Sequence, residues 1–355
     1  MKNIIKQTIK TIQKLISENE FKNTHKAKTT DFIRTRKLSF SDVVLFVIGL
    51  SNTSFDFERI NFCKSANIDS ISNAALSKAR DKIKFSAFRE LLSKTQQIIP
   101  TTNTFKGYRV IAVDGVKGEL PNTPEFMKKY RPSKIAKYPQ FHAVASFDVL
   151  NCKFIDAEFE MTISDEHKLA CNLINKHQVE NDIFLFDRGF PSIALIQCLE
   201  NKKLKFVARV SKSFLKEVND FTSQKATDKT VHIDYTNRRK ATSRVDNIEV
   251  PYSFNLRCVK VKLRSGETEV LITNLPKKTF SRKYIEHLYC LRWGIETSFN
   301  HLKNAINIEE FVGIKENSIK QEFYSILMKY NLVMQYINEA EYVSNLVKKK
   351  FKIGL

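Results

Sequence analysis

The chain has 355 residues, and its 59 lysines and arginines against 38 aspartates and glutamates give a formal net charge of +21. This surplus is too large for internal ion pairing, so we expect a polyanionic partner, either nucleic acid or an anionic membrane surface. The longest apolar run, Val43 to Leu50, is far shorter than the roughly 20 residues of a membrane span, and no signal-peptide pattern is found. We therefore expect a cytoplasmic protein of two or three structural units, whose six dispersed cysteines are buried thiols.

Residues 1 to about 100 have helical periodicity. Apolar side chains of the first twenty residues fall roughly on one side, which predicts a packed N-terminal helix; a helix lying on a membrane surface is the alternative. Further helix is expected over 39–50, capped by Ser39 or Ser41, and over 72–99. Basic side chains gather here, although lysines on a helix are by default solvated; they are Arg34, Arg36, Lys37, Lys78, Arg80, Lys82 and Lys84. We predict an all-helical domain over 1–100.

From Gly107 the pattern changes to strands. Segments 108–115, 141–150 and 152–160 are rich in β-branched and aromatic residues, and the short gap between the last two predicts a hairpin. The elements expected next are a helix capped by Ser164, a buried strand over 182–190, a helix over 192–201 and a strand over 204–210. This order predicts a mixed α/β sheet flanked by helices over 101–210.

Residues 211–280 interrupt the alternation of strand and helix. Three segments have strand character, at 229–235, 252–263 and 268–275, and a basic linker lies at 237–244. We predict a β-rich insertion over 211–280, followed by a helical part over 281–355 that ends in a basic tail.

Two aspartates occupy the same kind of position. Asp114 follows the apolar VIAV and precedes Gly115, and Asp187 follows IFLF and precedes Arg188 and Gly189. A single aspartate of this kind is more often a loop or capping residue. The repeated strand-acid-glycine pattern instead favours two carboxylates at the carboxyl edge of the sheet.

The stretch LYCLRWGIETSFNHLK adds a third acid on an apolar helix. At about 100° per residue, its side chains Tyr289, Arg292, Glu296 and Lys303 fall within roughly 60° of one another. An ordinary ion pair between Arg292 and Glu296 would contribute about 0.2–0.5 kcal/mol, but it would not explain the tyrosine and lysine on the same face. Trp293 points away from Glu296, and we expect it to pack in the core instead of stacking on a base.

Three carboxylates beside cations suit metal-dependent phosphoryl transfer. Magnesium takes hard oxygen ligands, commonly a few carboxylates with water and phosphate. Two such ions can activate the attacking hydroxyl and stabilise the leaving oxygen. Arginine and lysine beside the acids would hold neighbouring phosphates. Arg188, directly after the second aspartate, is a candidate for holding phosphate or balancing the acids.

The spacing Y-x2-R-x3-E-x6-K of residues 289–303 resembles the Y-R-E-K motif of bacterial insertion-sequence transposases of the DDE class, the fourth insertion-sequence family. The segments VIAVDG and FLFDRGF resemble the surroundings of the first two catalytic aspartates of that family. The likeness runs from about residue 30 to residue 335.

The resemblance implies a ribonuclease-H-like catalytic core, with its first part in 101–210 and its second part in 281–355, and a helical DNA-binding domain over 1–100. It implies that Asp114, Asp187 and Glu296 bind two Mg²⁺ ions, for which Mn²⁺ can substitute. It also implies that Tyr289, Arg292 and Lys303 contact DNA at the transposon end. A β-strand insertion between the second aspartate and the glutamate is common in such enzymes.

The implied reaction is cut-and-paste transposition. Hydrolysis at the terminal inverted repeats frees a 3′ hydroxyl, which attacks the opposite strand to form a hairpin; reopening and strand transfer into target DNA follow. The implied partners are the double-stranded transposon ends and target DNA. We expect a dimer on DNA, no membrane association, and a bacterial cytoplasmic location on the nucleoid.

Two other functions fit part of the pattern. A transposase-derived DNA-binding protein without catalysis would explain the charge, but the intact triad disfavours it. Another two-metal nuclease, such as a resolvase, would explain the triad but not the insertion or the Y-R-E-K residues. A membrane-surface protein would be indicated by vesicle binding that survives competitor DNA.

Overall fold

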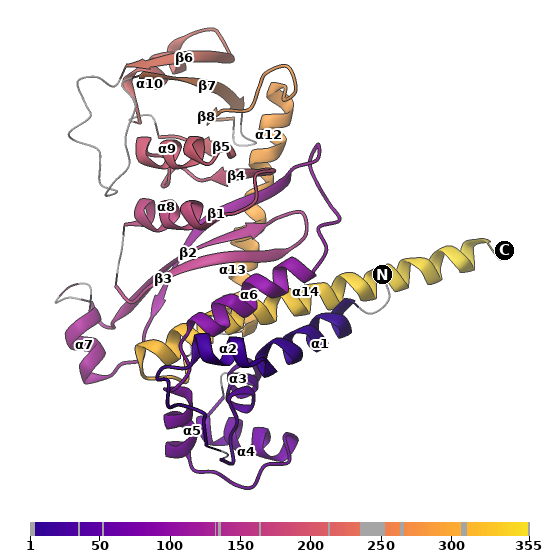
Figure 1. Ribbon diagram of the computed structural model, residues 1–355. Helices are drawn as coiled ribbons and strands as arrows, with labels where there is room; N and C mark the ends of the chain where they lie inside the picture. The colour runs from indigo at the N-terminus through magenta and orange to yellow at the C-terminus, as the bar shows by residue number, and fades with distance from the viewer. Residues whose placement is uncertain are drawn as a thin grey trace.

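The computed structural model describes residues 4–34, 36–51, 53–131, 133, 136–162, 165–211, 214–234, 253–262, 266–306 and 311–353. One mixed sheet forms its centre, with strand order β3-β2-β1-β4-β5-β8-β7-β6 (Figure 1). The basic linker expected at 237–244 lies outside the described residues. Within the described part, no helix is long and apolar enough to cross a membrane.

Helices precede the first strand, as expected. They are α1 (Ile4–Ser17), α2 (Asn19–His25), α3 (Phe40–Gly49), α4 (Phe55–Ser65), α5 (Asn73–Arg80) and α6 (Ser86–Ile98). Ser39 caps α3 in a reciprocal capping box with Asp42, whereas Ser41 donates to the Ile16 carbonyl. The helix expected over 72–99 is divided, because the turn before α6 pairs its backbone with residues after α2: the Ala27 amide donates to the Lys82 carbonyl.

Five strands form a ribonuclease-H-like core, as the resemblance implies. They are β1 (Arg109–Glu119), β2 (Gln140–Asp148), β3 (Lys153–Glu160), β4 (Asp182–Phe186) and β5 (Lys205–Arg209). The first three are antiparallel neighbours, and β4 and β5 continue the sheet in parallel with β1. Alternate residues of β1 enter two separate cores: Ala112 faces the core shared with the C-terminal helices, and Val113 faces the core shared with the crossover helices.

Three helices connect these strands. They are α7 (Pro124–Tyr130), α8 (Glu166–Lys176) and α9 (Ile193–Asn201). The strand pattern does not predict α7, which starts with Thr123 as its cap and Pro124 in its first turn. The cap of α8 is Asp165, not Ser164 as expected, and Ser164 lies outside the described residues. Ser192 caps α9.

The insertion extends the same sheet. Its elements are α10 (Lys216–Ser223), β6 (Asp228–Asp234), β7 (Ser253–Lys262) and β8 (Thr268–Thr273). The three strands expected from the sequence are therefore present. Strand β8 pairs antiparallel with β5, so that Ala208 lies opposite Ile272. The insertion thus places β8 directly beside the strand that neighbours β4.

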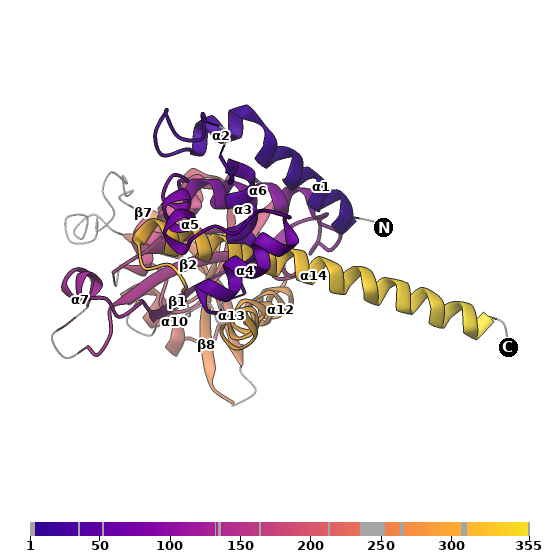
Figure 2. The same cartoon turned by 90° about the horizontal axis from the view of Figure 1, so that it is seen from below.

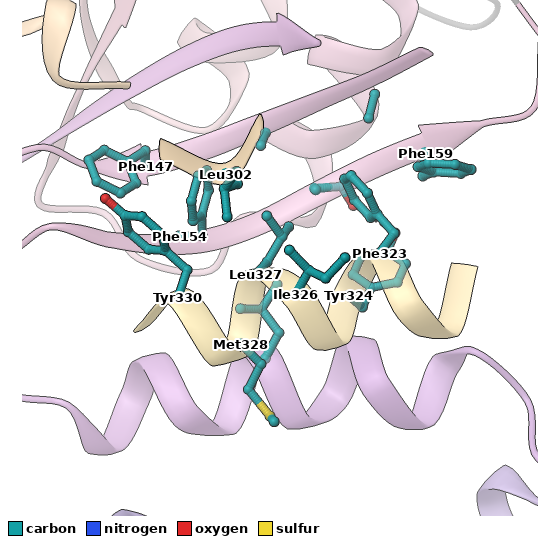
Figure 3. Close-up of a cluster of buried hydrophobic side chains, with 14 of the residues drawn as sticks. Phe147, Phe154, Phe159, Leu302, Phe323, Tyr324, Ile326, Leu327, Met328 and Tyr330 are labelled. Atoms are coloured by element: carbon teal, nitrogen blue, oxygen red, sulfur yellow. The ribbon is translucent and has the colours of Figure 1, made fainter. Parts of the chain in front are cut away.

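The chain ends in α12 (Arg282–Leu291), α13 (Trp293–Ile306) and α14 (Glu316–Ile353). Helix α14 packs against α6, both helices contact β3, and α14 extends beyond the body at its C-terminal end (Figures 1 and 2). Its aromatic side chains point towards those of β2 and β3 (Figure 3). The Tyr324 hydroxyl donates to the Ala157 carbonyl at 2.9 Å, and Asn331 bonds both backbone groups of Phe154. These hydrogen bonds hold α14 against β3, the edge strand of the sheet.

Arg80 departs from the expectation of a solvated basic cluster. Its side chain is only 3% exposed and pairs at 2.8 Å with Glu322 of α14, whose side chain is 2% exposed. Arg80 also donates to the Ser318 carbonyl. It therefore ties the N-terminal helices to the core and is not part of a DNA-facing surface.

Candidate active site

Asp114 and Asp187 reach the same region from neighbouring strands. Asp114 lies in the middle of β1 and not at its end, because β1 continues in its pairing with β2 as far as Glu119. Its parallel pairing with β4 nevertheless ends at Val113 and Phe186. The two aspartates are thus the residues that follow the last parallel pair, and the prediction of a shared carboxyl edge holds in this restricted sense.

Glu296 and Tyr289 come from the helices behind β1. The expected single helix is divided at Arg292, which has helical dihedral angles but separates α12 from α13. The Tyr289 hydroxyl donates to Oδ1 of Asp187 at 3.0 Å. Arg292 donates to Oε1 of Glu296 at 2.5 Å, while its guanidinium is almost completely buried. Helix α13 packs against β1, which brings Glu296 to the aspartates.

The pKa of Asp114 reflects this crowding of acids. The pKa of Asp114 is raised to about 6, mainly by burial and to a smaller extent by the negative charges of Glu296 and Asp187. The Gly115 amide, which donates to Oδ1 of Asp114 at 2.9 Å, and the Arg292 charge oppose this rise. The charges of Glu296 and Asp187 therefore act on Asp114, and the buried Arg292 acts on both aspartates.

Asp187 is held in its charged form. Burial alone would raise its pKa, but the backbone amide of Arg188 and the charges of Arg292 and Arg209 hold the pKa below its ordinary value. The Nε atom of Arg209 lies 2.9 Å from Oδ1 of Asp187. Arg209 is absent from the site expected from sequence. It ends β5, which pairs in parallel with β4 so that Ala208 lies opposite Phe186. Arg209 therefore follows its last strand pair as Asp187 does, and this shared position is the feature of the sequence that could have indicated it.

The donor chemistry of the three acids fits a hard divalent cation. All their donors are carboxylate oxygens, which are the ligands that such a cation prefers. As the described side chains are placed, however, no three histidines, cysteines or acids stand close enough to share an ion. Arg292 and Arg209 lie against Glu296 and Asp187 instead. Asp114, Asp187 and Glu296 could hold a metal only after a local rearrangement.

The remaining expected site residues lie around these acids. Lys303 is exposed and donates to the Lys117 carbonyl at 3.5 Å. Arg188 is exposed and lines a cavity of about 570 Å³. The expectation that Trp293 packs in the core is wrong, because its side chain is 60% exposed. The first position of α13 faces outwards, and the Arg292 guanidinium lies 5.0 Å from the indole ring centre.

Most of the expected N-terminal basic residues surround one groove of about 910 Å³. The basic side chains that line it are Arg34, Arg36, Lys37, Lys78 and Lys82. Phe32 and the largely exposed Ile33 supply apolar lining. Lys84 does not line this groove and donates to the Thr24 carbonyl. A positive groove of this kind suits a polyanion.

The chain is similar to known transposases in sequence. A family model described as the transposase DDE domain matches residues 105–332. The transposase InsG for insertion sequence element IS4 of Escherichia coli (strain K12) is 22% identical over 329 residues, which cover 88% of this chain and 73% of that protein. A solved structure of the piggyBac transposase synaptic complex with hairpin DNA is similar with a TM-score of 0.49 and 10% identity, over 95% of this chain and 76% of that one.

Proposed function

The chain belongs to the family of transposases with a DDE domain and is a DNA transposase, and on this premise we propose that Asp114, Asp187 and Glu296 are its catalytic acids. The observation that carries the proposal is the placement of the two aspartates directly after the last parallel pair of β1 and β4, with the buried Arg292 bonded to Glu296 and acting on both aspartates. Carboxylates that follow the last pair of two parallel strands, with a third on a packed helix, suit metal-dependent phosphoryl transfer.

The family uses divalent metals, and we propose two Mg²⁺ ions held by Asp114, Asp187 and Glu296, with Mn²⁺ as a substitute. When bound, the metal supplies activation of the attacking hydroxyl and charge neutralisation at the leaving oxygen. Tyr289 orients Asp187 through its hydroxyl. Arg292 keeps Glu296 aligned until substrate binds.

We propose that cationic side chains around the three acids bind the phosphates of the DNA. Lys303 and Arg188 are exposed beside the site and would contact the backbone of the transposon end. The N-terminal basic groove would hold more of the duplex, in keeping with a DNA-binding domain over 1–100. The exposed indole of Trp293 would stack on an unpaired base.

The proposed reaction is cut-and-paste movement of an insertion sequence, from hydrolysis at the terminal inverted repeats through hairpin formation to strand transfer. Both transposon ends must be held together, so the proposed assembly is a dimer on DNA, located on the nucleoid in the bacterial cytoplasm. The proposed units are the core parts 101–210 and 281–355, separated by the insertion 211–280.

The test is cleavage of duplex DNA taken from both flanks of the gene. The full chain in Mg²⁺ should produce new 3′ hydroxyls at defined positions within flanking inverted repeats, mapped by end-labelled sequencing. Binding should weaken steeply with added salt, because phosphate neutralisation contributes much of the affinity. Tight binding without cleavage in either Mg²⁺ or Mn²⁺ would instead indicate a DNA-binding protein without catalysis.

A further inference from the structure

Arg209 lies between an acid of the proposed active site and an acid of the insertion. Its Nε atom is 2.9 Å from Oδ1 of Asp187, and its Nη1 atom donates to Oε1 of Glu269 at 2.6 Å. Glu269 belongs to β8, two residues from Leu271, which lies opposite Arg209 in the sheet. Glu269 therefore links the insertion to Asp187 through Arg209.

Arg209 competes directly for an atom that a metal ion would need. The same Oδ1 atom of Asp187 already accepts the Tyr289 hydroxyl at 3.0 Å. The side chains of Arg209 and Asp187 are 19% and 28% exposed, so their attraction is screened less than that of a surface ion pair. A cation can bind both oxygens of Asp187 only if the guanidinium moves away from Oδ1.

Glu269 already accepts a hydrogen bond from Arg209 and has a second oxygen that Arg209 does not use. Its Oε2 atom is buried and accepts no hydrogen bond among the described residues. A guanidinium has five donors in a planar fork that matches both oxygens of a carboxylate or a phosphate. Glu269 also lines, with Arg188 and Lys260, the cavity of about 570 Å³ beside the site, which provides space for such a shift.

We propose that Arg209 is a latch on Asp187 that DNA opens. In the DNA-free chain, Arg209 is the counter-ion of Asp187 and opposes metal binding. Phosphates that enter the site draw the guanidinium onto themselves, with Glu269 holding its other edge, and Asp187 becomes available to the metal. Metal and DNA then bind with positive coupling, and each increases the affinity for the other. The inference rests on the proposed role of Asp187 as a metal ligand.

The latch can be tested by measuring Mn²⁺ affinity from the paramagnetic resonance signal of free Mn²⁺. The full chain is titrated alone and with a short duplex that lacks the flanking repeats, after subtraction of the ions that the duplex binds by itself. DNA should increase the Mn²⁺ affinity of the wild type about tenfold. Arg209→Gln should show about this increase without DNA, and DNA should then add little.

Further variants separate a latch from a general charge effect. Arg282→Gln removes an equal charge from an exposed side chain that donates to the Lys260 carbonyl, and it should leave the coupling as in the wild type. Arg209→Lys retains the charge and should restore part of the coupling. Glu269→Gln removes the charge of the second partner of Arg209 and should weaken DNA-free Mn²⁺ binding several-fold, which provides a second test if Arg209→Gln folds poorly.

Two results would overturn the proposal in distinguishable ways. If Asp187→Asn abolishes Mn²⁺ binding but Arg209→Gln has the DNA-free affinity of the wild type, the latch is wrong and the proposed metal ligand stands. If Asp187→Asn binds Mn²⁺ as the wild type does, the metal ligand and the latch are both wrong.

Discussion

Replacement of Glu296 by glutamine is expected to lower metal-dependent DNA cleavage by about 10³-fold or more, equivalent to roughly 4 kcal/mol of transition-state stabilisation. Glutamine has nearly the same shape, and its carbonyl oxygen can still accept the hydrogen bond from Arg292, so the helix position should be kept. The variant lacks the charge that would hold a metal. Single-turnover cleavage of the flanking DNA measures the loss, and a mobility-shift assay measures DNA affinity.

The matched control for this variant is Glu286→Gln. Glu286 is an acid of the preceding helix α12, so this substitution makes the same chemical change away from the three proposed catalytic acids. It should cleave at close to the wild-type rate. DNA affinity should be retained by Glu296→Gln, since removing a negative charge does not weaken phosphate binding. Cleavage by Glu296→Gln at the wild-type rate would show that this carboxylate is not catalytic.

Replacement of Arg80 by methionine is expected to lower the free energy of unfolding by about 3–5 kcal/mol. The change leaves Glu322 charged and buried, with the Val312 amide as one of its remaining partners. It also removes a hydrogen bond to the Ser318 carbonyl and loosens α5 from α14. Urea denaturation followed by circular dichroism measures the difference.

Two further variants test whether the buried ion pair causes this loss. Lys78→Met changes an exposed residue of the same helix and should alter stability by no more than about 0.5 kcal/mol. Adding Glu322→Gln to Arg80→Met removes the stranded charge and should recover part of the stability. A double variant as unstable as the sum of both single variants would contradict an interaction between the two side chains.

The strands of the core could be predicted because they combine short apolar runs with polar ends. Residues 183–186 are apolar and entirely buried, as expected for a strand covered on both faces. The insertion strands were predictable from β-branched content, but their position was not. Strand β8 pairs with β5, which is distant in the sequence, and the local residue pattern does not determine which strands pair.

The acids of the site could be predicted because each interrupts an apolar pattern. The side chains that pair with these acids and shift their pKa values could not be predicted. Arg209 and Glu269 look like ordinary charged strand residues until the sheet register places them beside Asp187. The predictions for Trp293 and Arg80 were wrong because they rested on residue type alone. Residue type suggested a buried indole and an exposed guanidinium, whereas tertiary packing exposes the first and buries the second.

The measurement that tests the metal-ligand assignment most directly is a change of metal preference with Asp187→Cys. A thiolate is a soft ligand that binds Mn²⁺ more readily than Mg²⁺. Cleavage of the flanking DNA by this variant should be lost in Mg²⁺ and recovered at least in part in Mn²⁺, while the wild type cleaves in both. Cleavage by the variant in Mg²⁺ at the wild-type rate would contradict the assignment of Asp187 to the metal site.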